Sequence, residues 1–380
     1  MAAEAGLNHA LERAHKQGNT QAHSAACIVL DAHDGSVLAM ASKPSFYPSS
    51  FVGGISPQDW EDLSSKESGY PLMNRAVSGQ FIPASTIKPL SVFAALDYKM
   101  ATPESTYVCH GYWTGMGSAY GKYCWDHSGH GALGLIGGIT YSCDVVFYEI
   151  AKAFYYSEHK EGLQATFRKW GLGKKTGVDL PGEAKGRVPD AKWKWNHYTS
   201  SPDADREWQG GDTTNIVIGQ GDMLVTPIQM AEVYLGIANR GPMWRPHVLK
   251  SILNRNATGS VIDYKPAMYL NPKESKEDYS IVDQGLKGVI YKESPGITRH
   301  FENLDVEVAG KTGSGERAGD KAATGWFCAF APASKPQYVV VALVENGGFG
   351  STTALYAVRD VLGEIYHQPD TSTADTAAVQ

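Results

Sequence analysis

A serine and a lysine lie one helical turn apart in the first third of the chain. Ser85 and Lys88 follow Pro83, where apolar positions begin to repeat with the period of a helix. Both side chains are therefore expected on one face of that helix. A serine hydroxyl needs a base to act as a nucleophile at neutral pH, and a partly desolvated lysine supplies one. Ser-x-x-Lys alone is a common pattern, which a solvated helix start explains equally well.

A second motif, Ser142 with Asp144, stands at the start of another expected helix over 142–156. Taken alone, the same residues read as a plain helix start, with Ser142 as the N-cap and Asp144 in the first turn.

The third motif is the run Lys311, Thr312, Gly313, Ser314 at the end of an expected strand. The lysine offers a fixed cation to a substrate carboxylate, and Thr312 and Ser314 add hydroxyl donors. Gly313 is expected to let substrate backbone approach closely. A polar turn with an exposed lysine is the alternative. A second Lys-Thr-Gly, at 175–177, lies in a turn-rich loop, so we assign the chemistry to Lys311.

Strands are expected near both ends of the chain, with helices between them. Two apolar runs joined at Gly35 predict a hairpin over 25–41, and a helix is expected before it. Further strands are expected at 306–312, 324–330 and 337–344, and the stretches 42–73 and 254–280 are expected to be irregular. These elements predict an α+β fold, with one antiparallel sheet flanked by helices and an all-helical subregion from the middle of the chain.

Composition excludes several classes of protein. Of 380 residues, 42% are hydrophobic and 19% charged, as in globular proteins, and the net charge of −6 shows no basic stripe for nucleic acid. No apolar run approaches the roughly 18–20 residues of a membrane span. The chain opens without a signal-peptide pattern. We therefore expect a soluble domain over 1–367 and a polar, disordered tail over 368–380.

The order of the three motifs resembles that of the penicillin-interacting serine enzymes. The flanking segments sharpen the likeness, namely 71–76, 177–183, 219–222 and 225–227. Together they are similar to class B penicillin-binding proteins of the elongation type, called penicillin-binding protein 2. The resemblance covers nearly the whole chain and implies the fold shared by penicillin-binding transpeptidases and serine β-lactamases.

Three departures from the family pattern are visible. Family members commonly have glycine where this chain has Ala84, and much of the superfamily has asparagine where it has Asp144. The elongation subgroup also uses aspartate there. Members carry an N-terminal membrane anchor and a pedestal domain, and neither is recognised here. The resemblance therefore implies a transpeptidase domain whose full-length protein is anchored on the extracytoplasmic face of the membrane.

The resemblance implies a serine-type D,D-transpeptidase that cross-links peptidoglycan stem peptides and is acylated by β-lactams. Ser85 would attack the donor peptide, Lys88 would take its proton, and Ser142 would relay a proton to the departing D-alanine, with Lys311 nearby. Asp144 could hydrogen-bond Lys88 and hold its orientation. A glycosyltransferase of the elongation machinery is the implied partner.

The same resemblance implies which groups bind the oxyanion that forms in the reaction and which bind the terminal carboxylate of the donor peptide. The backbone N–H groups of Ser85 and Ser314 would hold the oxyanion, and Thr312 and Ser314 would bind the terminal carboxylate. The alternatives are a D,D-carboxypeptidase or serine β-lactamase of this fold, and a β-lactam sensor domain. The sequence shows no dedicated water-activating carboxylate of the kind that a Glu-dependent β-lactamase needs.

A cysteine and histidine cluster precedes and includes the second motif. Cys109, Cys124, His130 and Cys143 could form a tetrahedral zinc site of three thiolates and one imidazole, with four protein ligands making the metal structural. Asp126 and His127 are competing ligands, and a disulfide or unpaired thiols are the alternatives. Some members of the elongation family have a metal site in this stretch. No cofactor is required for the chemistry itself.

Overall fold

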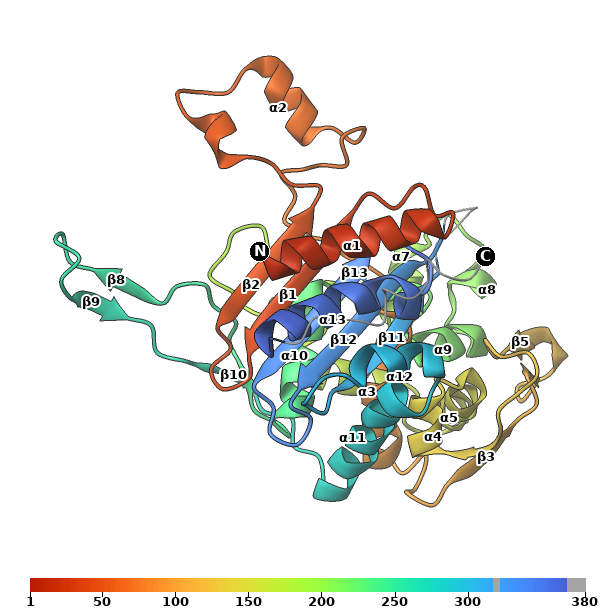
Figure 1. Cartoon of the computed structure of the whole chain (residues 1–380). Helices are drawn as coiled ribbons and strands as arrows, with labels where there is room; N and C mark the ends of the chain where they lie inside the picture. Colours follow the sequence, from red (N-terminus) through yellow and green to blue (C-terminus); the bar gives the residue numbers. More distant parts are fainter. Residues whose placement is uncertain (317–321, 368–380) are drawn as a thin grey trace, which may run out of the picture.

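The computed structural model describes residues 1–316 and 322–367, so the tail expected at 368–380 lies outside the described residues. Its centre is a five-stranded antiparallel sheet in the order β11-β12-β13-β1-β2 (Figure 1). The strands are β1 (Ala25–Asp31), β2 (Val37–Lys43), β11 (Ala309–Gly315), β12 (Thr324–Ala331) and β13 (Tyr338–Val344).

Strands from the two ends of the chain are neighbours in this sheet. β1 pairs with β13 over its whole length, from Ala25 opposite Val344 to Asp31 opposite Tyr338. The expected sheet built from both ends is therefore confirmed, as is the β1–β2 hairpin. Gly35 in the hairpin turn has φ +78°, and a Cβ there would lie 2.8 Å from the Cβ of Trp244.

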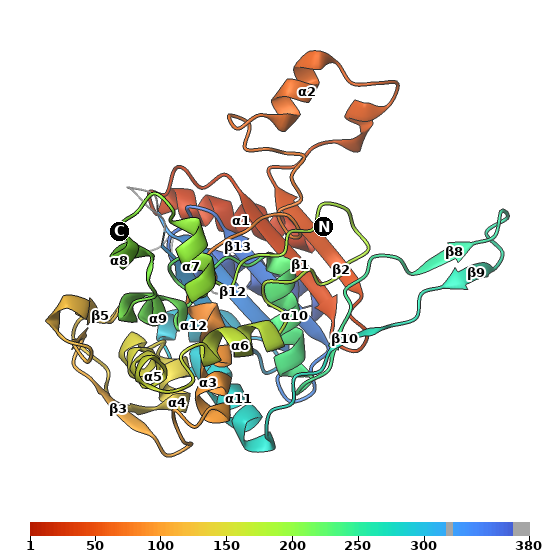
Figure 2. The ribbon, with the colours of Figure 1, turned by 180° about the vertical axis from the view of Figure 1, so that it is seen from behind.

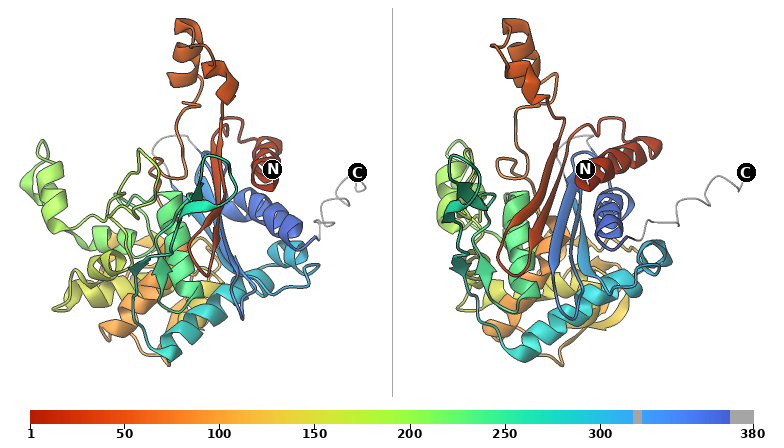
Figure 3. Two further views of the ribbon diagram at one scale, coloured as in Figure 1. Left: turned by 90° about the vertical axis from the view of Figure 1, so that its left-hand side faces the viewer. Right: turned by 60° about the vertical axis from the view of Figure 1, so that its left-hand side comes forward.

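Two long helices cover one face of the sheet, as the edge-on views in Figure 3 show. α1 (Ala2–Lys16) turns Leu7 and its other apolar positions inward, and α13 (Ala354–Ile365) packs beside it. A Cβ at Gly6 would lie 3.0 Å from the Ala357 backbone, so glycine lets these helices touch. The short α12 (Pro295–Phe301) adds Phe301, which stacks on Phe327 of β12.

The helical subregion covers the other face (Figure 2). Its central helix, α10 (Pro227–Ala238), is buried all round and starts at a capping box between Thr226 and Gln229. β12 is buried over its whole length because helices cover both faces of the sheet. The other helices of the chain are α2 (Pro57–Ser64), α3 (Lys88–Asp97), α4 (Leu135–Thr140), α5 (Asp144–Tyr156), α6 (Gly162–Lys169), α7 (Ala191–His197), α8 (Asp203–Arg206), α9 (Gly210–Ile216) and α11 (Lys276–Tyr291), with 3-10 turns η1 (Pro48–Phe51), η2 (Ala84–Ile87), η3 (Ser118–Tyr120) and η4 (Gly350–Thr352).

Two stretches expected to be irregular contain regular elements, which corrects the sequence reading. The first holds η1 and α2, which stand away from the sheet in Figure 1, and Ser56 caps α2 by accepting from the Asp59 N–H. The second holds a projecting ribbon and the start of α11 at Lys276. Apart from α11, the elements in these two stretches are too short for hydrophobic periodicity to reveal them. The short two-stranded pairs are β3 (Thr106–Cys109) with β6 (Gly131–Gly134), β4 (Tyr112–Trp113) with β5 (Lys122–Tyr123), β7 (Met243–Trp244) with β10 (Met268–Leu270), and β8 (Ser251–Leu253) with β9 (Ser260–Asp263).

Among residues 1–316 and 322–367, no helix has both the length and the apolar character needed to cross a membrane.

Candidate active site

Ser85 lies in the 3-10 turn η2, which runs directly into α3. The helix expected from Pro83 therefore begins one turn later, at Lys88. Pro89 gives the physical reason, because it lacks the N–H that would bond to the Ser85 carbonyl in an α-helix. The Lys88 N–H bonds to that carbonyl instead, which closes the tighter turn.

Three separate elements hold this turn in place. The indole Nε1 of Trp326 in β12 donates to Ile82 O at 2.9 Å, and Ala84 N donates to Gly219 O at 2.9 Å. From α10, the hydroxyl of Tyr234 donates to Thr86 O at 3.0 Å. The serine is therefore positioned by the sheet, the central helix and the 219–222 loop together.

Gly313 brings η2 against the strand β11. A Cβ at this position would lie 2.9 Å from the Thr86 side chain and 3.1 Å from Pro83 O. The sequence predicted that Gly313 lets substrate backbone approach closely. In the structure, the backbone that approaches Gly313 is the chain's own turn η2, which carries Ser85. Any side chain at 313 would push Ser85 away from β11.

Lys88 is fully buried and donates to three acceptors from the second motif. Its Nζ lies 2.7 Å from Ser142 O, 3.2 Å from Ser142 Oγ and 2.8 Å from Asp144 Oδ1. The expected contact between Asp144 and Lys88 is present. The other carboxylate oxygen, Asp144 Oδ2, accepts from the Trp125 N–H at 3.1 Å, so both oxygens have partners.

Ser142 does not cap the helix that follows it. α5 starts at Asp144 with Cys143 in the N-cap position, and no side chain makes a capping bond there. Ser142 itself has φ +51°, in the left-handed region that non-glycine residues rarely adopt. This backbone conformation places both its carbonyl and its hydroxyl beside Lys88. The alternative that Ser142 is the N-cap is therefore wrong, although Asp144 does lie in the first turn of the helix.

β11 forms one wall of the site. Lys311 is fully buried, and its Nζ lies 3.4 Å from Thr312 Oγ1. Burial lowers the pKa of Lys311 to about 8, while Glu293 acts in the opposite direction. At the end of the strand, Gln220 Nε2 donates to Ser314 O at 3.1 Å, and Gln220 Oε1 accepts from the Glu316 N–H.

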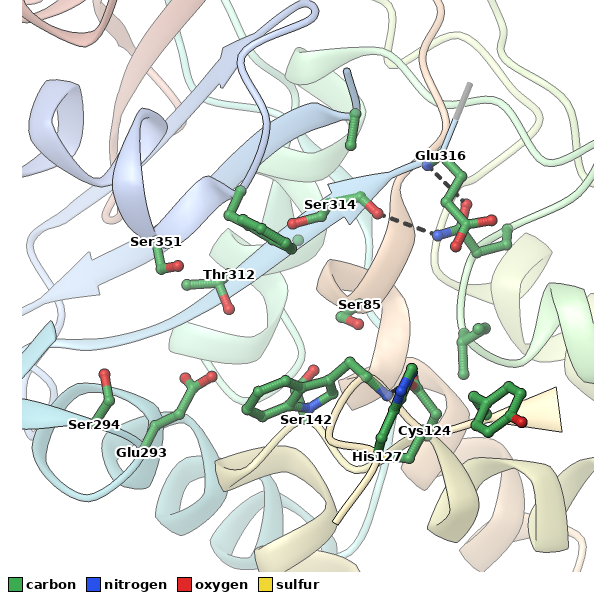
Figure 4. Close-up of a pocket in the computed structure, with 18 of the residues that line it drawn as sticks. Ser85, Cys124, His127, Ser142, Glu293, Ser294, Thr312, Ser314, Glu316 and Ser351 are labelled. Carbon is green, nitrogen blue, oxygen red and sulfur yellow. Dashed lines mark hydrogen bonds between the residues drawn. The ribbon is translucent and has the colours of Figure 1, made fainter. Parts of the chain in front are cut away.

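The three motifs meet in one pocket of about 630 Å³. Figure 4 shows the hydroxyls of Ser85, Ser142 and Thr312 directed into it, with Ser314 further along β11. Lys88 and Lys311 lie buried behind this surface. The site therefore combines a hydroxyl, two buried lysine side chains and further hydroxyl donors, a set suited to nucleophilic acyl transfer with recognition of an anion.

The sequence reading missed Glu293, which lines this pocket. It lies between α11 and α12, outside all three motifs, so no sequence signal marked it. Gln220 could have been found from the sequence, since it belongs to the 219–222 segment that carries part of the resemblance.

The second Lys-Thr-Gly, at 175–177, lies in a loop as expected. The carboxylate of Glu183 holds this loop by accepting hydrogen bonds from Thr176 and Gly177.

The cysteine cluster lies immediately behind the second motif. The ligand atoms of Cys109, Cys124, His130 and Cys143 all fall within 4.8 Å of one another, and all five cysteines of the chain are free thiols. His130 Nδ1 is 3.7 Å from Cys109 Sγ and 3.5 Å from Cys124 Sγ. The competing His127 is exposed and outside this group.

The chemistry of this donor set suits zinc. A hydrogen bond from Cys143 lowers the pKa of Cys124 far below its usual value, against the effect of burial, so one thiolate is already favoured. Tetrahedral zinc with Zn–S bonds near 2.3 Å puts ligand atoms about 3.8 Å apart. The observed spacing is close to this, and the residues present therefore fit the metal.

A scan against family models matches residues 25–366 to the penicillin binding protein transpeptidase domain. The peptidoglycan D,D-transpeptidase MrdA of Salmonella typhimurium is 32% identical over 93% of this chain, and that of Haemophilus influenzae is 32% identical over 90%. The chain spans 57% and 53% of those two proteins, little more than half their length.

Solved structures show the same architecture. Pseudomonas aeruginosa PBP2, in complex with WCK 5153, is 29% identical with a TM-score of 0.79, over 97% of this chain and 77% of that one. Helicobacter pylori PBP2, in complex with MreC, is 28% identical with a TM-score of 0.77, over 94% of this chain and 62% of that one. With its motifs gathered at one pocket and its fold shared along nearly the whole length, the chain belongs to the penicillin-binding protein transpeptidase domain family.

Proposed function

We propose that this domain is a peptidoglycan D,D-transpeptidase that acts through an acyl-enzyme on Ser85. The observation that carries the proposal is the contact of buried Lys88 with both Ser142 and Asp144, beside a pocket that Ser85 enters. The similarity to proteins named peptidoglycan D,D-transpeptidase supports the same activity.

In the acylation step, Ser85 Oγ attacks the penultimate carbonyl of a D-alanyl-D-alanine stem peptide and its proton passes to Lys88 in its neutral form. The backbone N–H groups of Ser85 and Ser314 stabilise the oxyanion. The C–N bond then breaks, and Ser142, 3.2 Å from Lys88 Nζ, relays a proton to the departing D-alanine. Asp144 fixes the position of Lys88 throughout.

The donor's terminal carboxylate binds at β11. Thr312 and Ser314 offer hydroxyls on the pocket side, and Lys311 supplies the positive charge behind them. An amine of a second stem peptide then attacks the ester, a C–N bond forms and the Ser85 hydroxyl is restored, which leaves a cross-link. β-Lactams acylate Ser85 in the same way.

The experiment is a time course of intact mass after adding benzylpenicillin. We expect an adduct that persists for hours on the wild-type chain and is absent from Ser85→Ala. Ser50→Ala, an exposed serine in η1, is the matched control and should acylate normally. An adduct that clears within minutes would indicate a β-lactamase, and an adduct that survives in Ser85→Ala would exclude this serine as the nucleophile.

We propose a structural zinc ion at Cys109, Cys124, His130 and Cys143. The metal would tie the loop that carries the first three ligands to the start of α5, because Cys143 lies directly between Ser142 and Asp144. With four protein ligands it has no open position, so its part is to hold the second motif in place.

The proposed setting is the extracytoplasmic face of the cell membrane, where the substrate is built. The full-length protein would be anchored through an N-terminal segment. Related structures support assembly with other proteins: one is described as a peptidoglycan synthase complex that coordinates polymerization and crosslinking, and the Helicobacter pylori PBP2 is bound to MreC. We therefore propose a glycosyltransferase partner. The domain extends over 1–367.

A further inference from the structure

A half-buried carboxyl group, one oxygen of which is unpaired among the described residues, lies at one end of the active-site pocket. Glu293 follows α11 and directs its carboxyl group toward Thr312 and the interior of the pocket (Figure 4). Its Oε2 is buried and has no hydrogen-bond partner among the described residues. Leaving such an oxygen unpaired costs about 1–3 kcal/mol, which points to a partner supplied by a ligand.

Glu293 differs from the other carboxylates that line the pocket. Asp144 is occupied on both oxygens, by Lys88 and by the Trp125 N–H. Glu316 is exposed at the far end of β11. Among the described residues that line the pocket, Glu293 therefore has the carboxyl group that remains available to bind a positively charged group.

The charges around Glu293 come from three elements. Burial raises its pKa, and Lys311 of β11, Lys88 of α3 and His130 oppose that effect. Among the described residues, none of these groups forms an ion pair within 4.0 Å of Glu293. They therefore act on its carboxyl group only over longer distances and leave Oε2 unpaired.

The position of Glu293 in the pocket indicates which part of a substrate it would contact in the proposed reaction. In the proposed donor pose the terminal carboxylate lies at Thr312, so the departing D-alanine occupies the space between Ser85, Ser142 and Thr312. By microscopic reversibility the acceptor amine enters where the leaving amine departs. The carboxyl of Glu293 points toward that same space.

We propose that Glu293 binds the ammonium group of the acceptor, so that this end of the pocket is the subsite for a primary amine carrying a positive charge. The inference rests on the proposed transpeptidase function. Glu293 thereby favours a charged amine over water by holding the acceptor close to the ester. The ammonium group gives one proton to the Glu293 carboxylate, and the freed lone pair of the amine forms the C–N bond as the ester C–O bond breaks. The second amine proton passes through Lys88 to Ser85 Oγ, which restores the hydroxyl.

The test compares acceptors of different charge on a thioester donor that ends in D-alanyl thioglycolate. D-Alanine carries an ammonium group at pH 7, while hydroxylamine is a neutral nucleophile there. For Glu293→Gln we expect the D-alanine concentration at half-maximal transfer to rise about tenfold or more, since one lost ion pair of 1.4 kcal/mol is a factor of ten. Transfer to hydroxylamine should change much less, and Glu293→Asp should restore part of the preference.

Glu302→Gln is the matched control, because this exposed residue at the C-cap of α12 loses the same charge outside the pocket. An equal loss with both acceptors would overturn the proposal and assign Glu293 to positioning Lys311. An unchanged half-maximal concentration would also overturn it, as would a selective loss of hydrolysis. If the wild-type chain forms no acyl-enzyme with the donor, the proposed function itself fails, which is a separate result.

Discussion

Lys88 donates a 2.8 Å hydrogen bond to Asp144 from a position with no solvent exposure. This contact fixes the position of the Lys88 Nζ that receives the Ser85 proton in the proposed acylation step, and a misplaced base slows proton transfer. We expect Asp144→Asn to lower the second-order rate of penicillin acylation by about 10–100-fold, equivalent to about 1.4–2.8 kcal/mol. Stopped-flow acylation with a fluorescent penicillin measures this rate. Asp59→Asn, which removes the same charge from projecting α2, should acylate at the wild-type rate.

Removal of zinc should loosen the second motif. We expect the purified chain to bind one zinc ion, measured by native mass spectrometry, and chelation to lower the Tm by about 5 °C or more. Cys143→Ser should lose the metal and reduce both the Tm and the acylation rate. Cys27→Ser, at a buried cysteine outside the cluster, should lower the Tm with zinc content unchanged. A Cys143→Ser protein with wild-type Tm and acylation rate would refute the proposed coupling.

The charge on Lys311 should limit acylation at high pH. Burial lowers its pKa to about 8, so the side chain is positive below pH 8 and becomes neutral above it. Acylation by a carboxylate-bearing β-lactam should therefore fall about tenfold per pH unit above 8. Lys311→Arg keeps its charge across this range, and its pH profile should lack that decline even if its rate is lower. If the acylation rate of Lys311→Arg falls in the same way above pH 8, the titrating group is not Lys311.

Gly219 touches the nucleophile turn. It has φ +70°, and a Cβ there would lie 2.4 Å from Ala84 O. Gly219→Ala should cost more than 2 kcal/mol of unfolding free energy, of which roughly 1–2 kcal/mol is backbone strain, and should slow acylation by displacing Ser85. Gly18→Ala isolates the strain, because Gly18 has φ +86° with nothing within 4 Å. Chemical denaturation and acylation rates separate the two effects, and equal losses in both variants would contradict the clash.

Glu232 should make the fold less stable as the pH rises. Both of its carboxylate oxygens are buried with no hydrogen-bond partner in the described part of the chain, and burial, followed by the charge of Glu183, raises its pKa well above 4.5. Stability contributed by the protonated group is complete below pH 4.5 and is lost above it, by about 1.4 kcal/mol per pH unit up to the folded-state pKa. The Tm of Glu232→Gln relative to wild type should therefore increase from pH 5 to pH 8. A constant difference across that range would show that the folded protein does not hold this carboxyl group in its protonated form.

Much of the site could be predicted from sequence because its motifs are short and local. The spacing of Ser85 and Lys88 and a strand that includes Lys311 need no knowledge of distant contacts. The strand expected over 306–312 is displaced, because β11 starts at Ala309 and continues to Gly315. The 3-10 turn at Ser85 was missed, although Pro89 was visible as its cause. The packing of Gly313 on Thr86 and the approach of Glu293 to the pocket depend on tertiary contacts, which no periodicity encodes.

The pairing of β1 with β13 also governs when the domain can fold during its synthesis. The hairpin of β1 and β2 leaves one edge of β1 without hydrogen bonds until Val344, opposite Ala25, has left the ribosome. Trp326, which supports the turn before Ser85, is made almost as late. Until β13 has been made, the growing chain carries an unpaired, apolar strand edge, which is the kind of edge that pairs with other chains and aggregates. Acylating activity should arise in a single step, once the last strand has joined the sheet.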